Sequence, residues 1–423
     1  MQQLAAVLWG IGFILTAIAL PVMVWQAVIG VAGLLPGRRK NRSGGWATRR
    51  YRFAVVVCAR NEETVIGRLL DSLMAQRYPR DRFDLFVAAD NCDDRTVAEA
   101  RSHGATAYER RDRRRVGKGF ALRWVLERIE KEHPGRYDAV AVFDADNVAT
   151  PDFLARMNDA LCAGADVAKG SRFASNPHDS WVSGSYAIYW RSMMRFFHRA
   201  RARCGLSCFV DGTGFAFRTA LIRDEGWNTR TIVEDCEFSM QQICRGRVIV
   251  PVEEAVYYDE QPTTFALSVR QRFRWTVGCV QCLKACFPDA LRALRPGSGV
   301  SLLEALDVLM YLLLFPAVAV GLAAGAVSFI AALFSPVSYV AANLAAFLSP
   351  LLSWAGLSLG GLLVLALDRQ PLKAYLPAVL MFPVFVYSMS LMALVAVFRP
   401  KVTWKPIAHT GSPVRFPTAG SLD

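Results

Sequence analysis

Two aspartates separated by one residue follow a short apolar run in the first half of the chain. The run is Ala139–Phe143, and the aspartates are Asp144 and Asp146. Two carboxylates at the end of a strand suit a hard divalent cation, Mg²⁺ or Mn²⁺, that neutralises a diphosphate and lets it leave. A surface turn has the same composition, so the pair alone leaves both interpretations open. Its position directly after an apolar run favours the metal site.

Gln271, Arg274 and Trp275 form a second set of residues that could do chemistry. They share one face of a helix, because they lie three and four residues apart. An arginine pairs with a diphosphate, a glutamine donates hydrogen bonds, and an indole face stacks on a sugar ring. The alternative is an interfacial helix whose basic residues face lipid headgroups and whose tryptophan lies at the membrane boundary.

Three further positions carry a possible function and a structural alternative each. Asp90 ends an apolar run and could contact a nucleobase or ribose, or it could cap a turn. Lys118, between two glycines, could bring a cation to a phosphate, or lie in a loop without function. Asp235, next to Glu234 ahead of a helical pattern, could be a general base, or both acids could complement the helix dipole.

A glycine-rich loop beside aromatic residues, 211–218, is a candidate acceptor-sugar site. Gly214 and Phe215 are the residues of this loop that we expect to contact the acceptor.

These residues must be positioned by strands and helices that alternate along the chain. Apolar runs at Phe53–Val57, Leu85–Ala89 and Ala139–Phe143 predict buried strands, and Glu62–Gln76 has the apolar face of a helix. This alternation predicts an α/β domain with a mostly parallel, nucleotide-binding sheet. Asp90 and the aspartate pair then follow strand ends, where open α/β sheets bind ligands.

Composition places the chain in a membrane. It has 423 residues, 53% of them hydrophobic, and a formal net charge of +13. A nucleic-acid partner is not expected, since basic residues and aromatics do not alternate on a recognisable module. Anionic lipid headgroups and an anionic nucleotide explain the charge more simply. The ten cysteines lack the spacing of a disulfide or zinc framework and indicate small apolar filler in a reducing compartment.

The apolar runs divide the chain into four parts. We expect a retained transmembrane helix in 1–36, a cytoplasmic catalytic domain with interfacial helices in 45–297, transmembrane helices in 302–398, and a tail in 399–423. The basic block after the first run, 38–50, predicts a cytoplasmic catalytic domain by the positive-inside rule, at the plasma membrane. The apolar runs 303–334, 337–367 and 375–398 would give four spans with the first. That number places the C-terminus outside, whereas the basic residues of the tail favour the cytoplasm, so either one of the long runs is not a simple single span or the tail breaks the charge rule.

Taken in order, the motifs resemble those of membrane-integrated, family-2 inverting glycosyltransferases, such as the cellulose, chitin, hyaluronan and poly-N-acetylglucosamine synthases. The resemblance covers roughly residues 50–290. It rests on Val57–Glu63, Asp90–Thr96, Gly117–Leu122, Asp144–Asp146, Val233–Asp235 and Gln271–Trp275. Two departures are Cys58, where the family often has proline, and Val233, where it usually has threonine.

The resemblance implies a GT-A-type domain in which Asp235 activates an acceptor hydroxyl for direct displacement at the anomeric carbon. Asp144 and Asp146 would hold Mg²⁺ or Mn²⁺ on a UDP-sugar. The implied donor contacts are Asn61, Glu62, Asp90, Lys118, Asp144, Gln271 and Arg274. The implied acceptor contacts are Gly214, Phe215, Glu234 and Trp275.

Three functions are compatible with these motifs. The first is elongation of a β-linked polysaccharide coupled to its export. The second is a non-processive enzyme that glycosylates a membrane lipid of the ceramide or diacylglycerol type, which shares the same motifs. The third, a transporter or receptor with an inactive nucleotide-binding domain, is disfavoured because every charged catalytic position is filled. The sugar and the oligomeric state stay open.

Overall fold

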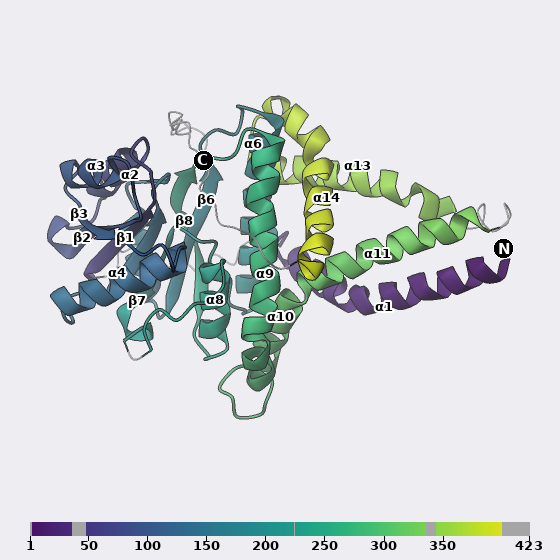
Figure 1. Ribbon diagram of the computed structural model, residues 1–423, viewed down its shortest axis with the longest axis horizontal. Helices are drawn as coiled ribbons and strands as arrows, with labels where there is room; N and C mark the ends of the chain where they lie inside the picture. The colour runs from purple at the N-terminus through teal and green to yellow at the C-terminus, as the bar shows by residue number, and fades with distance from the viewer. Residues whose placement is uncertain (1, 36–47, 224, 336–343, 400–423) are drawn as a thin grey trace.

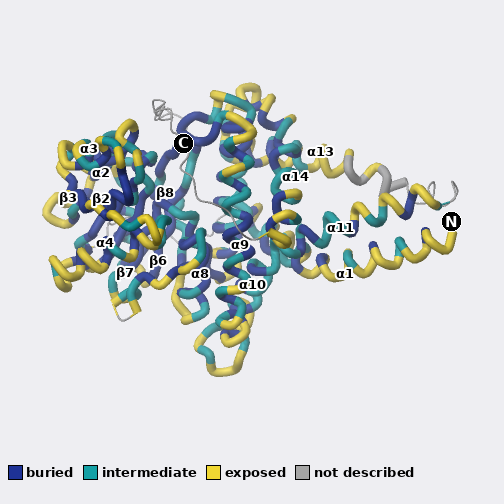
Figure 2. The backbone as a smooth tube through the Cα atoms, viewed as in Figure 1, coloured by how far each residue is buried: buried dark blue, intermediate teal, exposed yellow. Residues whose placement is uncertain are grey.

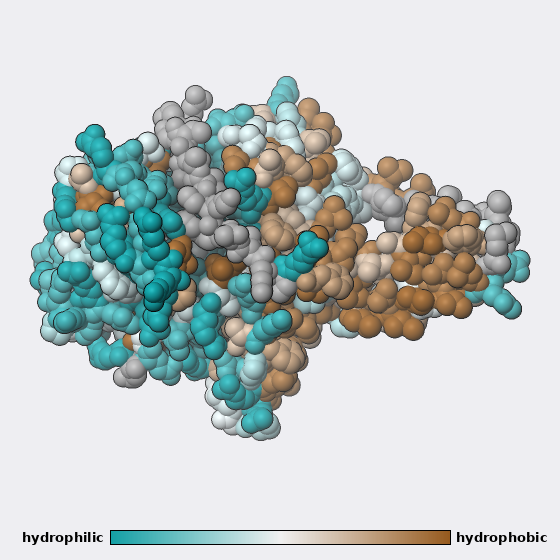
Figure 3. Space-filling view, in the orientation of Figure 1, coloured by the Kyte–Doolittle hydropathy of each residue, from teal (hydrophilic) through white to brown (hydrophobic). Residues whose placement is uncertain are grey.

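The computed structural model describes residues 2–35, 48–223, 225–335 and 344–399. Figure 1 shows a lobe built around one β-sheet, two long helices beside it, and apolar helices that extend away from the lobe. The polar and apolar parts of the sequence thus separate in space (Figure 3).

One eight-stranded sheet forms the centre of the lobe, in the order β3-β2-β1-β4-β7-β6-β8-β5. The strands are β1 (Phe53–Ala59), β2 (Phe83–Asp90), β3 (Thr106–Arg110), β4 (Ala139–Asp144), β5 (Val148–Ala149), β6 (Val167–Ala174), β7 (Phe215–Arg218) and β8 (Ile249–Asp259). Of the seven strand pairings among the described residues, four are parallel and three antiparallel. The predicted α/β fold with a mostly parallel sheet is therefore confirmed.

The register of the parallel strands brings the predicted acidic residues to one edge. Cys58 of β1 pairs with Ala88 of β2 on one side and with Asp144 of β4 on the other. Asp90, two residues after Ala88, consequently ends its strand at the same edge as Asp144. This is the arrangement that the sequence predicted.

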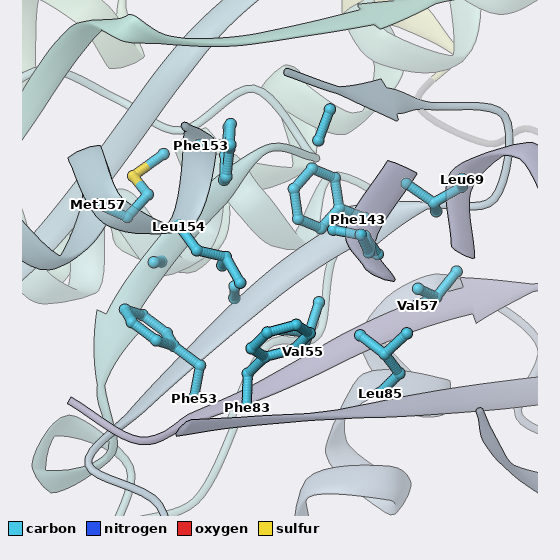
Figure 4. Packing of buried hydrophobic residues seen from close by; sticks show 14 of the residues in the cluster. Phe53, Val55, Val57, Leu69, Phe83, Leu85, Phe143, Phe153, Leu154 and Met157 are labelled. Carbon is cyan, nitrogen blue, oxygen red and sulfur yellow. The ribbon is translucent and has the colours of Figure 1, made fainter. Parts of the chain in front are cut away.

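Helices cover both faces of the sheet, because alternate strand residues point to opposite faces and are buried on both. On one face, β1 packs Phe53, Val55 and Val57 against residues from α2 (Ile66–Met74) and α5 (Phe153–Cys162) (Figure 4). On the other face, Ala54 and Val56 pack against α4 (Lys118–Glu132) and the layer that includes α8 (Glu234–Ile243). The short helices η1 (Arg80–Arg82), α3 (Thr96–Ser102) and η3 (Thr219–Leu221) complete the lobe. The helix predicted over Glu62–Gln76 forms only as α2.

Two helical segments close the lobe on its apolar side. One is a continuous segment made of α6 (Trp181–Ser192), a π-helical turn η2 (Met193–Arg199) and α7 (Ala200–Arg203). The other is the long helix α9 (Phe265–Ala293). Side chains cap both at their first turn: Ser183 N–H donates to Ser180 Oγ at 3.1 Å, and Leu267 N–H donates to Thr264 Oγ1 at 3.4 Å. α9 contacts α8, α10, α11 and α14, so it joins the lobe to the apolar helices.

Three helices among the described residues are long and apolar enough to cross a membrane: Gln2–Ala32, Leu314–Leu333 and Leu372–Phe398. They correspond to α1 (Gln2–Ala32), α11 (Leu314–Leu333), and η4 (Leu372–Tyr375) together with α14 (Leu376–Phe398). α13 (Leu344–Leu367) contributes a shorter apolar stretch, Leu351–Leu367. Many residues of these helices are exposed (Figure 2), and large apolar residues such as Phe13, Leu333 and Leu391 are among them, which is expected of surfaces that face lipid.

The apolar run predicted at 303–334 is not one span. It divides into α10 (Leu302–Leu312) and α11, and α10 packs its Val308 and Leu312 into the core of the lobe. Asp307 of α10 is 3% exposed and pairs with Arg201 at 2.8 Å, while Trp25 of α1 donates to its other oxygen. A helix that buries a carboxylate among such partners belongs to the lobe boundary rather than to the bilayer.

Other parts of the predicted layout lie partly outside the described residues. These are the basic block in 38–42, the start of the run 337–367, and the tail from 400. The loop between α13 and α14 is described, and its Asp368 pairs with Arg191 and Arg195 of the α6–η2 segment at 3.1 and 2.5 Å. It therefore lies on the lobe side of the apolar helices. All ten cysteines are free, and only Cys204 is exposed, in agreement with a packing function.

Candidate active site

A cavity of about 360 Å³ opens at the carboxyl edge of β1, β2 and β4. Its size falls within the range of small-molecule sites. It brings together ten of the predicted residues: Glu62, Asp90, Lys118, Asp144, Asp146, Glu234, Asp235, Gln271, Arg274 and Trp275. They come from the strand ends, from the first turns of α4 and α8, and from one face of α9.

The turn that carries Asp144 and Asp146 is held by two neighbouring polar side chains. Asp144 N–H donates to Thr213 Oγ1 at 2.8 Å, and the Thr213 hydroxyl donates to Asn147 Oδ1. Asn147 in turn donates from Nδ2 to Asp146 Oδ1 at 3.2 Å. Thr213 is fully buried, so its hydrogen bonds fix the direction of the aspartates without competition from water. Sequence reasoning singled out neither Thr213 nor Asn147 as a support for the pair.

The two aspartates fit a divalent cation that a substrate helps to coordinate. Among the described residues, no group of three or more histidine, cysteine, aspartate or glutamate side chains is arranged to hold a metal. Mg²⁺ and Mn²⁺ commonly take one or two carboxylates from the protein and complete their shell with phosphate oxygens and water. Asp144 is 37% exposed to the cavity, which leaves its carboxylate accessible for such a shared ion.

Lys118 lies at the first turn of α4, beside the aspartate pair. Its Nζ donates to the Asp144 carboxylate and to the carbonyl of Gly212. Burial lowers the pKa of Lys118, but the carboxylates of Asp144 and Glu234 outweigh burial, and the net effect raises it. The ammonium therefore stays charged, next to free backbone N–H groups at a helix N-terminus. That combination attracts a phosphate.

Asp90 is buried and held by an arginine from the neighbouring strand. Its Oδ1 accepts from Arg110 at 2.6 Å and from Asn91 Nδ2 at 2.8 Å. Arg110 begins a run rich in arginines, 110–115, but it is 5% exposed and neutralises Asp90 within the protein.

Asn61 does not line the cavity, so the predicted donor contact is corrected to a structural one. Its Oδ1 accepts from Asp93 N–H at 2.9 Å, and its φ is 57°. The next residue, Glu62, does line the cavity, and its N–H donates to Thr96 Oγ1 at 2.8 Å. Asn61 thus ties together the loops after β1 and β2 that hold Glu62 and Asp90 in place.

Glu234 and Asp235 begin α8 at the centre of the cavity wall. Burial raises the pKa of both carboxyl groups, and the charge of Asp235 raises that of Glu234 further. Gly212, at φ 86°, lies directly opposite: a Cβ there would be 3.5 Å from Asp235 Oδ2. An aspartate in this position accepts a proton more readily than an exposed one.

Residues at the start of α8 pack this helix against α9. Val233, the residue that departs from the family pattern, packs against Gly278, where a Cβ would collide with the valine. Glu237, one turn further, accepts from the N–H groups of Arg230 and Thr231 at 2.7 Å each. The departure at Val233 therefore supports the packing that places Asp235 opposite the α9 residues.

The α9 residues form the wall facing the strand ends. Gln271 Oε1 accepts from the Tyr186 hydroxyl at 2.7 Å, and the Trp275 ring meets the edge of Trp190 at 5.7 Å between centroids. Burial lowers the pKa of Arg274. Arg272 points the other way, over the Phe385 ring of α14 at 3.8 Å. The alternative of a helix that turns these residues toward lipid is not what the structure shows.

The predicted acceptor contacts at Gly214 and Phe215 are corrected. Phe215 is 1% exposed and packs with Trp227 and Phe238 in the core, because it begins strand β7 and faces away from the cavity. Gly214, at φ 63°, lies against the Tyr257 ring, where a Cβ would collide. From the same loop, Asp211 and Gly212 line the cavity instead.

Arg172 of β6 also lines the cavity and was missed. Its guanidinium pairs with Asp259 and lies 4.1 Å from the Trp190 ring centroid. It also donates to the Asp211 carbonyl at 3.2 Å. Its partners are 18 to 87 residues away in sequence, and no local motif marks it.

Apolar side chains from the membrane side of the molecule also line the cavity. They are Met193, Phe315 and Met389, from η2, α11 and α14. Phe315 and Met389 belong to helices long and apolar enough to span a membrane. One cavity thus joins a cluster of carboxylates and cations to side chains of the membrane helices.

Relatives of known name resemble this chain in its catalytic lobe. The beta-monoglucosyldiacylglycerol synthase of Synechocystis is 29% identical over 246 residues, covering 54% of this chain and 47% of the relative. The glucomannan 4-beta-mannosyltransferase 7 of Arabidopsis thaliana is 28% identical over 201 residues, covering 44% of this chain and 34% of the relative. The chain spans about half the length of the first relative and a third of the second.

A solved structure shares the fold. The mannosyltransferase PcManGT from Pyrobaculum calidifontis, in complex with GDP-mannose and Mn²⁺, superposes with a TM-score of 0.59 at 19% identity. The match covers 93% of this chain and all of that one. Residues 50–278, more than half of the chain, match the family described as "Glycosyltransferase like family 2". The chain therefore belongs to the family-2 glycosyltransferases.

Proposed function

We propose that this chain transfers a sugar from a nucleoside-diphosphate sugar to a hydroxyl group of a membrane lipid. The observation that carries the proposal is the cavity itself, which is lined both by charged residues such as Asp144 and Lys118 and by the apolar residues Phe315 and Met389 of the membrane helices. A nucleotide sugar suits the charged residues, and the apolar part of a lipid suits the apolar ones. The relatives named as diacylglycerol glucosyltransferases support this acceptor class.

The nucleotide-sugar donor would lie against the charged residues of the cavity. Asp144 and Asp146 would hold Mg²⁺ or Mn²⁺, which neutralises the diphosphate as it leaves. Lys118 at the α4 N-terminus and Arg274 offer the cationic groups that bind the phosphates. Glu62 and Asp90, at the ends of β1 and β2, are the proposed contacts of the nucleoside. PcManGT, which shares the fold, was solved with Mn²⁺ and a nucleotide sugar.

Asp235 is the proposed general base. As the acceptor hydroxyl attacks the anomeric carbon, its proton passes to the Asp235 carboxylate, and the bond from that carbon to the diphosphate oxygen breaks. Attack from the face opposite the diphosphate inverts the anomeric configuration. The raised pKa suits this transfer, because a base is most effective when its pKa is near the working pH. Glu234 and Trp275, on the same wall, are the proposed acceptor contacts.

A growing polysaccharide is the second candidate acceptor, favoured by the glucomannan mannosyltransferases among the relatives. They match 42% to 59% of this chain at 25% to 28% identity, whereas the beta-monoglucosyldiacylglycerol synthase of Synechocystis matches 54% at 29% identity. The comparisons give no support to coupling with export, which the sequence had led us to expect. The lipid acceptor is therefore the better supported of the two.

We propose an integral membrane location, with the catalytic domain on the cytoplasmic side of the plasma membrane. Three spanning candidates and the loop at Asp368 that returns to the lobe support this arrangement. A cytoplasmic lobe would also have direct access to nucleotide sugars.

The test is the partition of label from the donor. The purified protein in lipid nanodiscs containing dioleoylglycerol is given Mn²⁺ and radiolabelled UDP-glucose, UDP-N-acetylglucosamine or GDP-mannose. Label from one donor is expected in the organic phase, and the Asp144→Asn protein should give none. Label that precipitates in ethanol as high-mass material, with none in the organic phase, would contradict the lipid acceptor and favour a polysaccharide.

A further inference from the structure

A carboxylate beside the base has no assigned function in this reaction. Asp211 lines the cavity next to Gly212, the residue that faces Asp235. Its side chain is 10% exposed. Burying a carboxylate costs free energy of folding unless the charge is paired, so the residues that pair with Asp211 indicate its function.

Two buried residues, Lys169 and His198, contact the Asp211 carboxylate. Lys169 Nζ lies 2.6 Å from Oδ2, and His198 Nε2 lies 3.2 Å from Oδ1. The side chains of Lys169 and His198 are 2% and 0% exposed. They come from β6 and η2, so a strand of the sheet and the π-helical turn both meet at this carboxylate.

The partners keep Asp211 ionised. Burial raises its pKa, but His198 and Lys169 outweigh burial and lower it. Burial lowers the pKa of His198 to about 4, so the imidazole is neutral. An ionised carboxylate has about four lone-pair directions. Lys169 and His198 each lie against one oxygen, and Oδ2 is closed off from solvent, so Oδ1 is the oxygen that can accept from a donor in the cavity.

Asp211 lies between the base and an aromatic wall. On one side, Gly212 faces the Asp235 carboxylate. On the other, Arg172 donates to the Asp211 carbonyl at 3.2 Å while lying over the Trp190 ring. A hydroxyl bound by Asp211 would therefore lie next to the hydroxyl that Asp235 deprotonates. The acceptor group that bears both hydroxyls would lie near the indole ring of Trp190.

We infer that Asp211 determines acceptor specificity by accepting a hydrogen bond from a second hydroxyl of the acceptor. The preferred lipid then has a polyol headgroup, as a lipid that already carries a sugar does. This inference rests on the proposed lipid acceptor and adds the class of headgroup. A diacylglycerol, with one free hydroxyl, lacks the group that Asp211 binds.

The experiment compares two acceptors in the same nanodiscs: dioleoylglycerol and monoglucosyl-dioleoylglycerol. A hydrogen bond to a charged group changes binding by about tenfold or more, so wild-type protein should prefer the glycolipid by at least that factor in kcat/KM. Asp211→Asn should reduce the preference to within about threefold, by loss on the glycolipid alone, with the KM for the donor unchanged.

Asp166→Asn is the matched control. Asp166 is also 10% exposed and paired, with Arg218, but it does not line the cavity. This variant should keep the wild-type preference even where it lowers thermal stability. A loss of preference in Asp166→Asn comparable to that in Asp211→Asn would overturn the inference, because the effect would then follow from the loss of any buried pair.

The remaining outcomes separate the two proposals. Equal use of both lipids by wild-type protein would overturn the inference without any variant, even if Asp211→Asn fails to fold. An equal loss on both lipids in Asp211→Asn would also overturn it and leave Asp211 a structural residue. Label in neither lipid but in ethanol-insoluble polymer would instead remove the proposed lipid acceptor, and this inference with it.

Discussion

Replacing Thr213 with valine should weaken metal binding although it leaves both proposed metal ligands, Asp144 and Asp146, unchanged. The substitution keeps the side-chain shape but removes the hydroxyl that accepts from Asp144 N–H at 2.8 Å and donates to Asn147 Oδ1. Thr213 is 0% exposed, so water cannot replace the hydroxyl. Two polar groups in the turn that carries the aspartate pair lose a partner.

The magnitude follows from these contacts. Leaving a buried polar group unsatisfied costs about 1–3 kcal/mol. Asp144 N–H keeps a longer contact with Asn147 Oδ1 at 3.3 Å, so only one polar group is left without a good partner. We therefore expect the free energy of unfolding to fall by about 2 kcal/mol, the middle of the range for one group. Loss of a residue that orients a metal ligand typically reduces metal affinity or activity by about 10–100-fold.

The assay is the Mn²⁺ dependence of sugar transfer. The Mn²⁺ concentration for half-maximal activity should rise by about tenfold or more in Thr213→Val. Thr150→Val is the control, since its hydroxyl donates to the Val256 carbonyl at 2.9 Å and it does not line the cavity. An unchanged Mn²⁺ dependence in Thr213→Val, with a lowered thermal midpoint, would show that Thr213 stabilises the fold but does not position Asp144.

Two further predictions concern the base and the boundary between lobe and membrane helices. Because burial raises the pKa of Asp235, and the base must be deprotonated, kcat should fall with decreasing pH on an acid limb well above the ordinary aspartate pKa of about 3.9; a pH–rate profile that is flat down to about pH 4.5 would contradict this. The side chains of Arg201 and Asp307 are 1% and 4% exposed and pair at 2.8 Å. Arg201→Met or Asp307→Leu alone should therefore lower the free energy of unfolding by about 3–5 kcal/mol, while the double variant recovers most of that loss. Thermal unfolding in detergent measures this, and a double variant no more stable than the singles would refute the pairing.

The sequence predicted the parts of the site that depend on local periodicity. Asp90 and Asp144 follow apolar runs, and parallel strands bring their carboxyl ends to one edge, so their meeting could be inferred. Gln271 and Trp275 share a helical face by spacing alone. These inferences needed only the repeat of a strand or a helix.

The errors arose where packing decides between equivalent patterns. In the loop 211–218, Gly214 and Phe215 were interpreted as acceptor contacts from the glycines and aromatics, yet Phe215 and Phe217 alternate with small or polar residues as a strand does, and both are buried in the core. The run 303–334 carries charge only at Glu304 and Asp307, and its sequence is apolar across the break between α10 and α11. Only the contacts of Asp307 show that α10 belongs to the lobe.

The residues that were missed carry no local signal. Lys169 and His198 lie 42 and 13 positions from Asp211, which belongs to the predicted loop 211–218, and they meet it only because β6, η2 and that loop converge. The same holds for Arg172 and Asp259, which are 87 positions apart. A single sequence shows the type of each residue but not which distant partner it will find.

In the proposed reaction Asp235 removes the proton from an acceptor hydroxyl, and single-turnover transfer by Asp235→Asn is the sharpest test of this role. The amide cannot take up the proton, so transfer from bound nucleotide sugar should fall by at least about 100-fold. Thermal stabilisation by UDP with Mn²⁺ should be unchanged, since Asp235 lies on the acceptor side of the cavity. Transfer at near wild-type rate by Asp235→Asn would contradict the account.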